Sequence, residues 1–349
     1  MRHITIAGRG SKLAMVQNEI VKGILENEGF EVSILPMSTK GDRDKKTAVT
    51  SLGGNGPFVR DVEQALLDGR ADIAVHCVKD LPYDGADGLV IAGILDEADP
   101  GDVLLMKKGM MCRLRSSCYS DLMEDKNLLN LPQPCNSDRG KSNEKACGEE
   151  DIQGIHRNIV GWKNIEGHAQ GAARIDRQSQ TDSNIGAENE NKVPAESILR
   201  IGTGSPRRRL QLMRMYPNIS CRDIRGNITT RINKLREGLY DGIVLAKAGL
   251  DRIGADVSEF EVIAFAPDAM IPAVGQGLLA VQCRAEDEEM RNLLFGLSPA
   301  KAYLRFMIER EIFCRYRLDC RDAVGVYAAI DKEALKVDLK ILWETEKHI

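Results

Sequence analysis

The chain has 349 residues, of which 43% are hydrophobic, and a formal net charge of −4 at pH 7. A chain of this length can bury more than one core, so we expect two or three domains. The negative net charge argues against a nucleic-acid partner held by bulk electrostatic attraction. No apolar run approaches the roughly 18 residues of a membrane span, so we expect no membrane partner either.

Two features of the chain predict its compartment. The nine cysteines lack the paired spacing of a secreted disulfide scaffold, so they are expected to be reduced thiols. Met1 is followed almost at once by a predicted strand, which leaves no room for a signal or transit peptide. We therefore expect a cytoplasmic protein.

The first hundred residues predict an alternating α/β unit. Apolar patterning indicates strands at 3–8, 32–37 and 71–76, with helices at 11–28 and 58–67 between them. Strands that alternate with helices in this way form a parallel sheet.

A second unit of the same kind begins with a strand at 199. It continues with a helix after Ser205, strands at 220–224 and 242–246, and a helix at 229–237. The end of the chain predicts helices at 288–297 and 300–313, followed by strands at 323–330 and 335–343. We expect two α/β lobes with a ligand cleft between them, and a small third α+β domain.

Composition sets the expected domain boundaries. Lobe one is assigned to residues 1–96 and 270–284, lobe two to 97–108 and 197–269, and the third domain to 285–349. Between 109 and 196 the chain turns polar and loses its periodic apolar positions, which predicts a disordered insertion. The insertion carries four cysteines and two histidines but no Cys-x-x-Cys pair, so we expect no metal site.

An arginine-rich helix start is the strongest local signal. Ser205 reads as the N-cap and Pro206 as the first helical residue. Residues 207–209, all arginine, then fall in the first turn, where a cation is disfavoured by roughly 0.3–1 kcal/mol. Free backbone N–H groups, the hydroxyls of Thr203 and Ser205 and the arginines together predict a site for a carboxylate or phosphate. A solvated basic helix end is the alternative.

Other polar side chains follow the ends of predicted strands. They are Arg9 and Ser11 after the first strand, Lys79 and Asp80 after the third, Arg225 and Arg231 in the second unit, and Gln276 in a Gly- and Pro-rich hinge at 271–277. The carboxyl ends of strands are where α/β proteins bind ligands, so we interpret these groups as lining the cleft. For the adjacent Lys79 and Asp80, ordinary surface charge is the alternative.

The ordered set of motifs resembles the porphobilinogen deaminase (hydroxymethylbilane synthase) family. The motifs are RGS, GGNGPF, VHCVKDLP, GTGSPRRR, IRGNITTR, LAKAGLDRIG and IPAVGQG, and they cover residues 1–108 and about 197–329. The resemblance implies two lobes like those of periplasmic binding proteins and a third domain that is truncated here. It also implies a monomeric cytoplasmic transferase of haem and tetrapyrrole biosynthesis.

The resemblance further implies a reaction, a cofactor and a set of site residues. Four porphobilinogen molecules are joined head to tail into hydroxymethylbilane with release of ammonia, on a covalent dipyrromethane cofactor. Asp80 would be the catalytic carboxylate. Cofactor-binding residues would be Cys320, Lys79, Ser11, Arg9, Thr203, Ser205, Arg207, Arg208 and Arg225. Substrate-binding residues would be Arg9, Arg225, Arg231, Arg252, Gln276 and Phe58.

The cysteine that holds the cofactor by a thioether is assigned by family spacing. Cys320 lies ten residues after Arg310 of a Glu-Arg pair, and Gly325 follows at the matching position. Cys314 is the nearest competitor, although it reads as a buried helix residue.

Departures from the family pattern keep a second function open. Leu318 and Asp319 stand where the family has glycines before the tether cysteine, Ala323 replaces a proline, and Asn55 replaces a lysine. The alternative is a non-catalytic, degenerate solute-binding-like paralogue that binds small carboxylates. A regulatory protein that recruits partners through the insertion is a third possibility. Lys79, Asp80 and Cys320 favour the enzyme, because a binding protein needs none of them.

Overall fold

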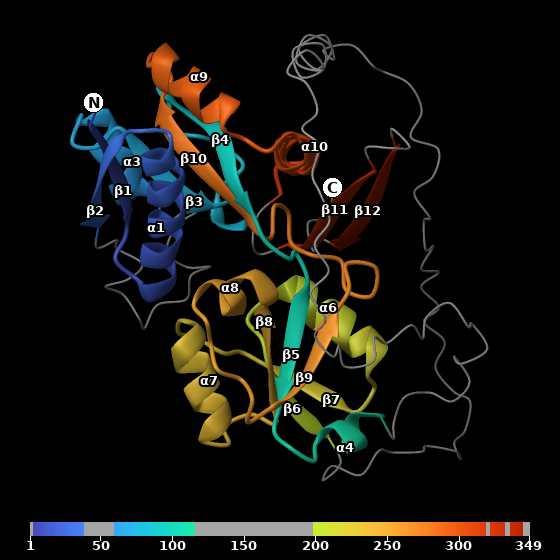
Figure 1. Ribbon diagram of the computed structural model, residues 1–349. Helices are drawn as coiled ribbons and strands as arrows, with labels where there is room; N and C mark the ends of the chain where they lie inside the picture. Colours follow the sequence, from blue (N-terminus) through green and yellow to red (C-terminus); the bar gives the residue numbers. More distant parts are fainter. Residues whose placement is uncertain (1–2, 38–58, 116–197, 319–321, 332–335, 345–349) are drawn as a thin grey trace, which may run out of the picture. The chain divides into compact units, whose positions relative to one another are not determined.

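The computed structural model describes residues 3–37, 59–115, 198–318, 322–331 and 336–344 (Figure 1). The expectations for Phe58, Cys320 and nearly all of the insertion lie outside these residues. Residues 126–193 also lie wholly outside the described ranges. In the part of the chain that is described, no helix is both long and apolar enough to cross a membrane.

The first sheet has five strands in the order β2-β1-β3-β10-β4 (Figure 1). Strands β1 (His3–Arg9), β2 (Glu31–Met37) and β3 (Ile73–Cys77) run parallel. Strand β10 (Leu278–Arg284) runs antiparallel between β3 and β4 (Leu89–Glu97). The chain therefore returns to the first sheet, through β10, after it has formed the second sheet.

Helices α1 (Lys12–Asn27), α3 (Arg60–Leu67) and α9 (Glu288–Gly296) pack on this sheet. Ser11 caps α1 by accepting a hydrogen bond from the backbone N–H of Ala14 at 3.4 Å, which supplies one of the partners that a helix start lacks. The core of this part joins apolar residues of β1, α1, β10 and α9.

The second sheet has the order β7-β6-β8-β5-β9. Strands β6 (Leu199–Gly202), β7 (Ile219–Arg222) and β8 (Gly242–Ala246) are parallel, and β5 (Asp102–Met106) runs antiparallel between β8 and β9 (Glu261–Phe265). Helices α6 (Pro206–Met215), α7 (Ile228–Arg236) and α8 (Lys247–Arg252) follow its parallel strands. Two mixed sheets with covering helices confirm the predicted α/β class.

Among the described elements, apolar periodicity missed three strands and two short helices, one of which is α8. Strands β4, β5 and β9 were not assigned from the sequence, although every residue of β5 is buried; an unbroken apolar run does not show the alternation of a half-exposed strand. Helix α4 (Met111–Arg115) lies inside the predicted insertion. Its Leu114 is fully buried against the second sheet, so ordered structure extends past residue 109.

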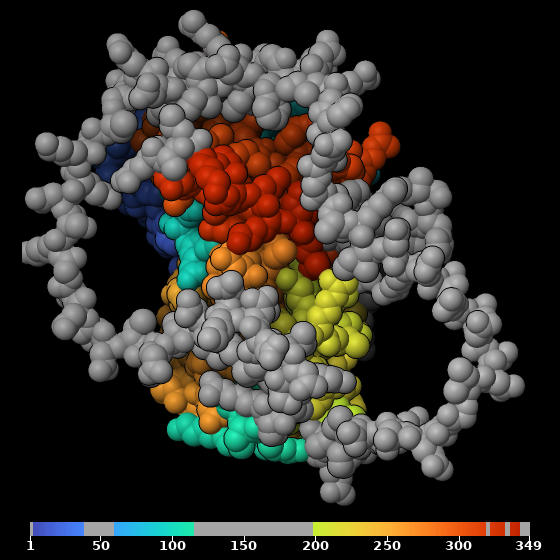
Figure 2. All heavy atoms as spheres, turned by 90° about the vertical axis from the view of Figure 1, so that its right-hand side faces the viewer, coloured from blue at the N-terminus to red at the C-terminus, as the bar shows by residue number. Residues whose placement is uncertain are grey.

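The C-terminal part consists of α10 (Ala300–Arg315) and an antiparallel pair, β11 (Ala323–Asp331) and β12 (Lys336–Glu344). Strand β11 contacts both α10 and α6, and Figure 2 shows the yellow surface around α6 beside the red surface of the C-terminal residues. Val326 donates its backbone N–H to the carbonyl of Pro272 at 3.1 Å. This part is therefore attached directly to the hinge at 271–277.

Candidate functional site

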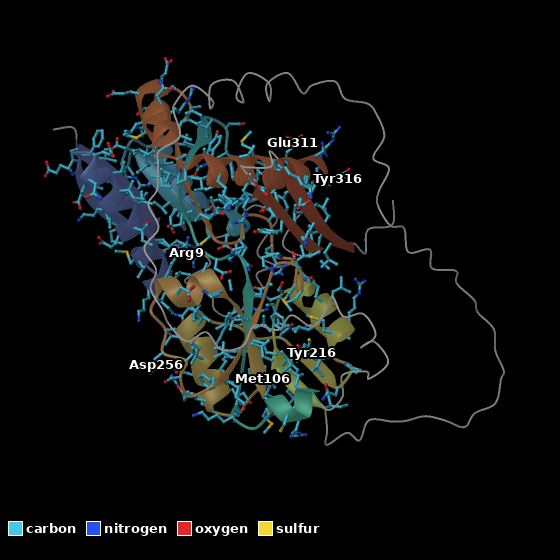
Figure 3. The ribbon with its side chains drawn as sticks, turned by 45° about the vertical axis from the view of Figure 1, so that its right-hand side comes forward. Arg9, Met106, Tyr216, Asp256, Glu311 and Tyr316 are labelled. Atoms are coloured by element: carbon cyan, nitrogen blue, oxygen red, sulfur yellow. The ribbon has the colours of Figure 1, made fainter. Side chains whose placement is uncertain are left out.

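A small polar pocket forms where β1 and β3 end. These two strands are parallel neighbours, so their carboxyl ends lie at the same edge of the sheet. Arg9 follows from β1 (Figure 3), and Ser11, Gln17, His76 and Asp80 join it as lining residues. The structure thus brings Arg9, Ser11 and Asp80 together as the sequence predicts.

Lys79 and Asp80 project from a short 3₁₀ turn, η2 (Val78–Asp80), that follows β3 directly. Val78 is buried and anchors the turn, while the two charged side chains remain partly exposed. Lys79 Nζ lies 2.6 Å from Asp80 Oδ1. The Asp80 charge raises the pKa of the Lys79 ammonium, so the pair presents both signs of charge side by side.

The hinge and α10 hold this turn from two sides. Gly275 has φ +64°, and a Cβ there would overlap the side chain of Val78, so only glycine lets the hinge approach η2 so closely. Arg310 donates to the carbonyl oxygens of Leu81 and Pro82 just after the turn. Any shift of the hinge or of α10 therefore reaches Asp80.

The anion bound at the arginine-rich helix start is a side chain of the protein itself, the carboxylate of Asp102. Arg207 and Arg208 are buried, and their guanidinium groups each lie 2.8 Å from a carboxylate oxygen of the fully buried Asp102. Burial alone would raise the pKa of Asp102, but the two guanidinium charges outweigh it and lower that pKa. Asp102 is the partner that the unfavourable helix-start charge requires.

Gln276 completes this buried group. Its side-chain amide donates to Asp102 Oδ1 at 3.0 Å and to the carbonyl of Pro100, and its oxygen accepts weakly from Arg207 at 3.5 Å. Arg207 also donates to the carbonyl of Ile271. Sequence reasoning assigned Gln276 and the arginines to ligands and missed Asp102, whose signal is an acidic residue at the start of a wholly apolar strand.

The capping prediction is confirmed in detail. The Ser205 side chain accepts from the backbone N–H of Arg208 at 3.5 Å, and Pro206 is the first residue of α6. Thr203, which is fully buried, accepts from the backbone N–H of Ser205 at 3.2 Å. Both hydroxyls therefore shape the helix start, and their binding of a cofactor stays a prediction.

Arg231 carries a charge that the described part of the chain does not balance. Its Nε donates to the carbonyl of Gly226 at 2.7 Å, and no carboxylate of the described residues pairs with its guanidinium group. Burial is the main cause that lowers the pKa of Arg231, followed by the charge of Arg208, while Asp80 opposes the shift. Arg231, Arg208 and Asp80 are thus close enough to act on one another.

Two other predicted ligand residues have different surroundings. Arg252 pairs with Asp96 at 2.6 Å and donates to the carbonyl of Gly277, so it ties α8 to the two segments that connect the sheets. Arg225 is exposed in the segment between β7 and α7, and its backbone carbonyl accepts a hydrogen bond from Lys234 at 3.0 Å. Their proposed contacts with substrate remain predictions.

A second buried ion pair was missed by the sequence analysis. Arg305 and Glu309 of α10 are almost fully buried and pair at 2.8 Å. Glu309 accepts from the backbone N–H groups of Gly275 and Ala328, while Arg305 donates to the carbonyl of Gln276 at 2.7 Å. The pair joins the hinge to β11, and its sequence signal is two opposite charges four residues apart in one helix.

The chain before Cys320 departs from the family pattern for a visible reason. Arg317 has φ +49°, and Leu318 donates its backbone N–H to Phe313 at 3.1 Å, an arrangement that closes helix ends. Leu318 is buried in an apolar cluster with Val274 and Val324. The leucine that replaces a glycine therefore anchors the start of the loop.

Two mixed α/β sheets, with basic side chains around one partly exposed aspartate, define a protein that binds a small anionic ligand. A model described as porphobilinogen deaminase, dipyromethane cofactor binding domain, matches residues 4–121 and 163–292. The chain belongs to the porphobilinogen deaminase family, and it has the family's dipyrromethane-binding domain.

Curated relatives agree over most of the chain. Porphobilinogen deaminase of Roseiflexus sp. is 31% identical over 95% of this chain and 83% of its own length. The enzyme of Nitratiruptor sp. is 30% identical over 94% of this chain and 79% of its own. A periplasmic arginine-specific binding protein of Salmonella typhimurium aligns with 6% identity and a TM-score of 0.36 over 89% of this chain and 98% of its own. The curated deaminase relatives do not favour the alternative function, a non-catalytic binding protein.

Proposed function

We propose that this chain condenses four porphobilinogen molecules head to tail into hydroxymethylbilane, releasing ammonia at each addition, in tetrapyrrole and haem biosynthesis. Arg231 carries this proposal. A half-buried guanidinium that forms no ion pair with a carboxylate of the described residues and lies near Asp80 and Arg208 is available to bind an anion. Porphobilinogen supplies two carboxylates per molecule, and each addition brings more.

The residues present fit the dipyrromethane cofactor, which also carries carboxylates. Arg9 and Ser11 line the pocket beside Asp80, and Lys79 adjoins it. With Thr203, Ser205, Arg225 and the arginines Arg207 and Arg208, which already pair with Asp102, these residues would hold the cofactor, and Cys320 would tether it. When bound, the dipyrromethane supplies the terminal pyrrole carbon to which the first substrate is joined.

Asp80 would act as the catalytic carboxylate. Loss of ammonia breaks a C–N bond, the electron pair leaves with nitrogen, and positive charge spreads over the ring and its N–H. A carboxylate that accepts a hydrogen bond from this N–H stabilises the charge as it develops. The partly exposed Asp80 side chain lines the pocket and is not sealed in the core, so it is available for this contact.

Arg225, Arg231, Arg252, Gln276 and Phe58 would bind the substrate. Among them Arg231 has the strongest structural support, whereas Gln276 and Arg252 already contact other parts of the chain. We propose a monomeric, cytoplasmic enzyme without nucleic-acid or membrane partners. The charge of −4 and the absence of paired cysteine spacing support this proposal.

Intact mass spectrometry tests the function and the tether together. The purified full chain should carry the mass of two linked pyrroles, and incubation with porphobilinogen should add further pyrrole units. A Cys320→Ser variant should lack the adduct, whereas Cys314→Ser should retain it. A chain that stays unmodified with substrate would contradict the proposed activity; an adduct retained in Cys320→Ser would contradict the tether.

A further inference from the structure

His76 lies in the same pocket as Asp80 but has no role in the mechanism above. It is the fourth residue of β3, with 9% of its surface exposed, and its ring lines the pocket. Strand β3 and the turn that follows it thus bring two acceptor-bearing side chains, His76 and Asp80, to one small volume of about 70 Å³. Such a volume admits a few water-sized groups, which suits a single substituent of a substrate ring.

The hydrogen bonds behind His76 fix which of its nitrogens carries the proton. Gln282 Nε2 donates to Glu63 Oε1 at 3.1 Å, and a carboxylate can only accept. The other end of the Gln282 amide, its oxygen, therefore faces His76 Nε2 at 2.9 Å. Because that oxygen can only accept, Nε2 must be the protonated nitrogen, and Nδ1 keeps its lone pair.

The free nitrogen has no hydrogen-bond partner among the described residues, and it belongs to a residue that lines the pocket. Gln282 is the hydrogen-bond partner of the imidazole, and no further partner exists for it in the described residues. Nδ1 is not among the buried polar atoms that lack a partner, so it is open to the space that the ring lines. Burial is the main cause that lowers the pKa of His76 to about 4, so the ring is neutral near pH 7.

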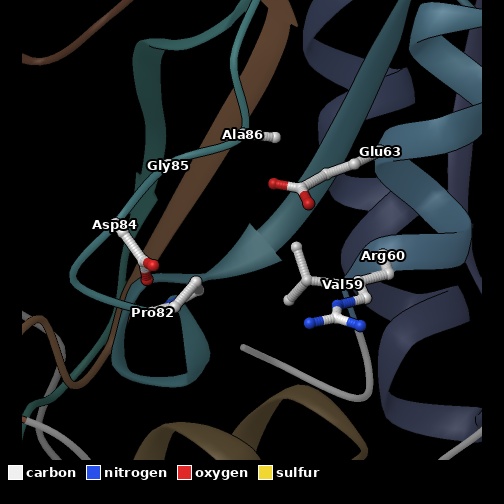
Figure 4. Close-up of a pocket in the computed structure, with 7 residues that line it drawn as sticks. All are labelled: Val59, Arg60, Glu63, Pro82, Asp84, Gly85 and Ala86. Carbon is white, nitrogen blue, oxygen red and sulfur yellow. The ribbon is translucent and has the colours of Figure 1, made fainter. Parts of the chain in front are cut away.

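The hydrogen-bonded series from His76 through Gln282 ends at Glu63, which lines a second pocket that shares Val59 with the first. Glu63 belongs to α3, and its carboxylate points into a cavity of about 190 Å³ that Arg60, Pro82 and Asp84 also line (Figure 4). An amide does not pass protons along such a chain at neutral pH. Glu63 and Gln282 are therefore positioning residues, which set the tautomer of His76 without exchanging protons with it.

We propose that His76 determines specificity for the aminomethyl group of the substrate, its Nδ1 accepting a hydrogen bond from the substrate ammonium. The inference rests on the proposed function. Asp80, an anion, serves the ring N–H, where positive charge grows during the reaction. The neutral His76 serves the ammonium, whose charge disappears as ammonia leaves, so its contact is strongest before the reaction.

This difference predicts a particular kinetic signature. A contact that weakens on the way to the transition state contributes to substrate binding and does not accelerate the chemical step. A hydrogen bond to a charged group corresponds to about ten- to hundredfold in binding. His76→Phe should therefore raise KM about ten- to hundredfold, and kcat should rise with it, because the bound substrate loses more stabilisation than the transition state does.

A substrate analogue separates this contact from general damage to the pocket. A porphobilinogen analogue with methyl in place of aminomethyl lacks the ammonium, so His76→Phe should leave its inhibition constant within about twofold. Glu63 does not line the His76 pocket, but its carboxylate fixes the Gln282 amide. Glu63→Gln leaves that amide free to turn, so it should raise KM by a smaller factor than His76→Phe does. The matched control is His3→Phe, at an exposed position of β1, with unchanged KM.

The outcomes distinguish the inference from the function on which it rests. A wild-type chain that adds no pyrrole units overturns the proposed function itself. If the wild type turns over, an unchanged KM in His76→Phe, or a fall in kcat alone, overturns the role of His76. An equal loss of affinity for the methyl analogue also overturns it.

A measurement on the unmodified chain covers the case in which His76→Phe does not fold. Nitrogen-15 NMR of the imidazoles, with the His76 signal assigned through a His76→Gln variant, reports the tautomer directly. We expect protonated Nε2 and a free Nδ1 whose signal shifts when porphobilinogen is added. A protonated Nδ1, or an Nδ1 signal unmoved by bound substrate, overturns the proposal.

Discussion

Asp102 Oδ1 accepts hydrogen bonds from both Nε and Nη2 of Arg208, at 3.1 and 2.8 Å, although the two residues are 106 positions apart. Its second oxygen accepts from Arg207 at 2.8 Å. One fully buried carboxylate thus pairs with two guanidinium groups at the start of α6. Because Gln276 of the hinge donates to the same carboxylate, this group fixes the hinge and the helix start together.

Removing the Asp102 charge should destabilise the chain strongly. Asp102→Asn leaves two buried guanidinium groups without a counter-charge, and breaking a buried pair in this way costs about 3–5 kcal/mol. Urea unfolding at pH 7 measures the change. The control is Asp223→Asn, whose partner Arg209 is exposed, where we expect less than about 1 kcal/mol. Similar losses for both variants would contradict a special role of the buried group.

Arg231 should show the opposite balance between stability and function. Arg231→Leu removes a half-buried cation that forms no ion pair with a described carboxylate. The free energy of unfolding should therefore stay the same or increase by up to about 1 kcal/mol. Substrate binding should weaken at least tenfold, because a charged contact with a substrate carboxylate is lost. Arg209→Leu, on the exposed side of α6, is the control. A KM unchanged in Arg231→Leu would remove this residue from the binding site.

Asp80 should be dispensable for the fold and indispensable for turnover. Its side chain is about half exposed, and among the described residues its ion pair is with the neighbouring Lys79, so Asp80→Asn should change the free energy of unfolding by less than about 1 kcal/mol. Turnover should fall at least a hundredfold, because the amide cannot stabilise developing positive charge as a carboxylate does. Stopped assays with ammonia detection measure this. Substantial residual turnover would exclude Asp80 as the catalytic carboxylate.

The helix start at Ser205 shows how far sequence reasoning reaches in this chain. Ser205, Pro206 and the following arginines gave the cap, the first helical residue and the need for an anion, all from local rules. The anion found there, Asp102, lies on β5, whose place beside β8 and β9 depends on sheet order. No local pattern encodes that order, so the pairing became visible only in three dimensions.

The pocket shows the same division. Arg9, Ser11 and Asp80 were predicted to meet because they follow neighbouring parallel strands, and they do line one pocket. His76 was passed over, since a histidine on a buried strand looks like part of the core. Its orientation depends on Gln282 of β10 and Glu63 of α3, which come from distant parts of the chain.

The left-handed residue at the end of α10 offers a test of the loop before Cys320. Arg317 has φ +49°, a conformation that costs a residue with a side chain about 1 kcal/mol relative to glycine. Arg317→Gly should therefore stabilise the chain by about that amount in urea unfolding. Arg315→Gly, at the last helical residue of α10, should destabilise it by up to about 1 kcal/mol. Equal signs for the two variants would contradict the observed helix end.

Acid should weaken the fold through His76 before most carboxylates titrate. Burial lowers the pKa of His76 from 6.5 to about 4, so between these values the unfolded chain binds a proton that the folded chain does not. The stability that depends on a neutral His76 is therefore fully present above about pH 6.5 and is lost as the pH falls toward 4.

The loss should reach about 3 kcal/mol at the lower end of this range. Urea unfolding at intervals from pH 7 to pH 4.5 measures it, with His76→Gln as the reference, because glutamine does not titrate. The wild type should lose stability more steeply than His76→Gln over this window, whereas His3→Gln, at an exposed position, should follow the wild type. Parallel pH profiles for the wild type and His76→Gln would mean that the pKa of His76 is the same in the folded and the unfolded chain, which would contradict the burial of a neutral ring at this position.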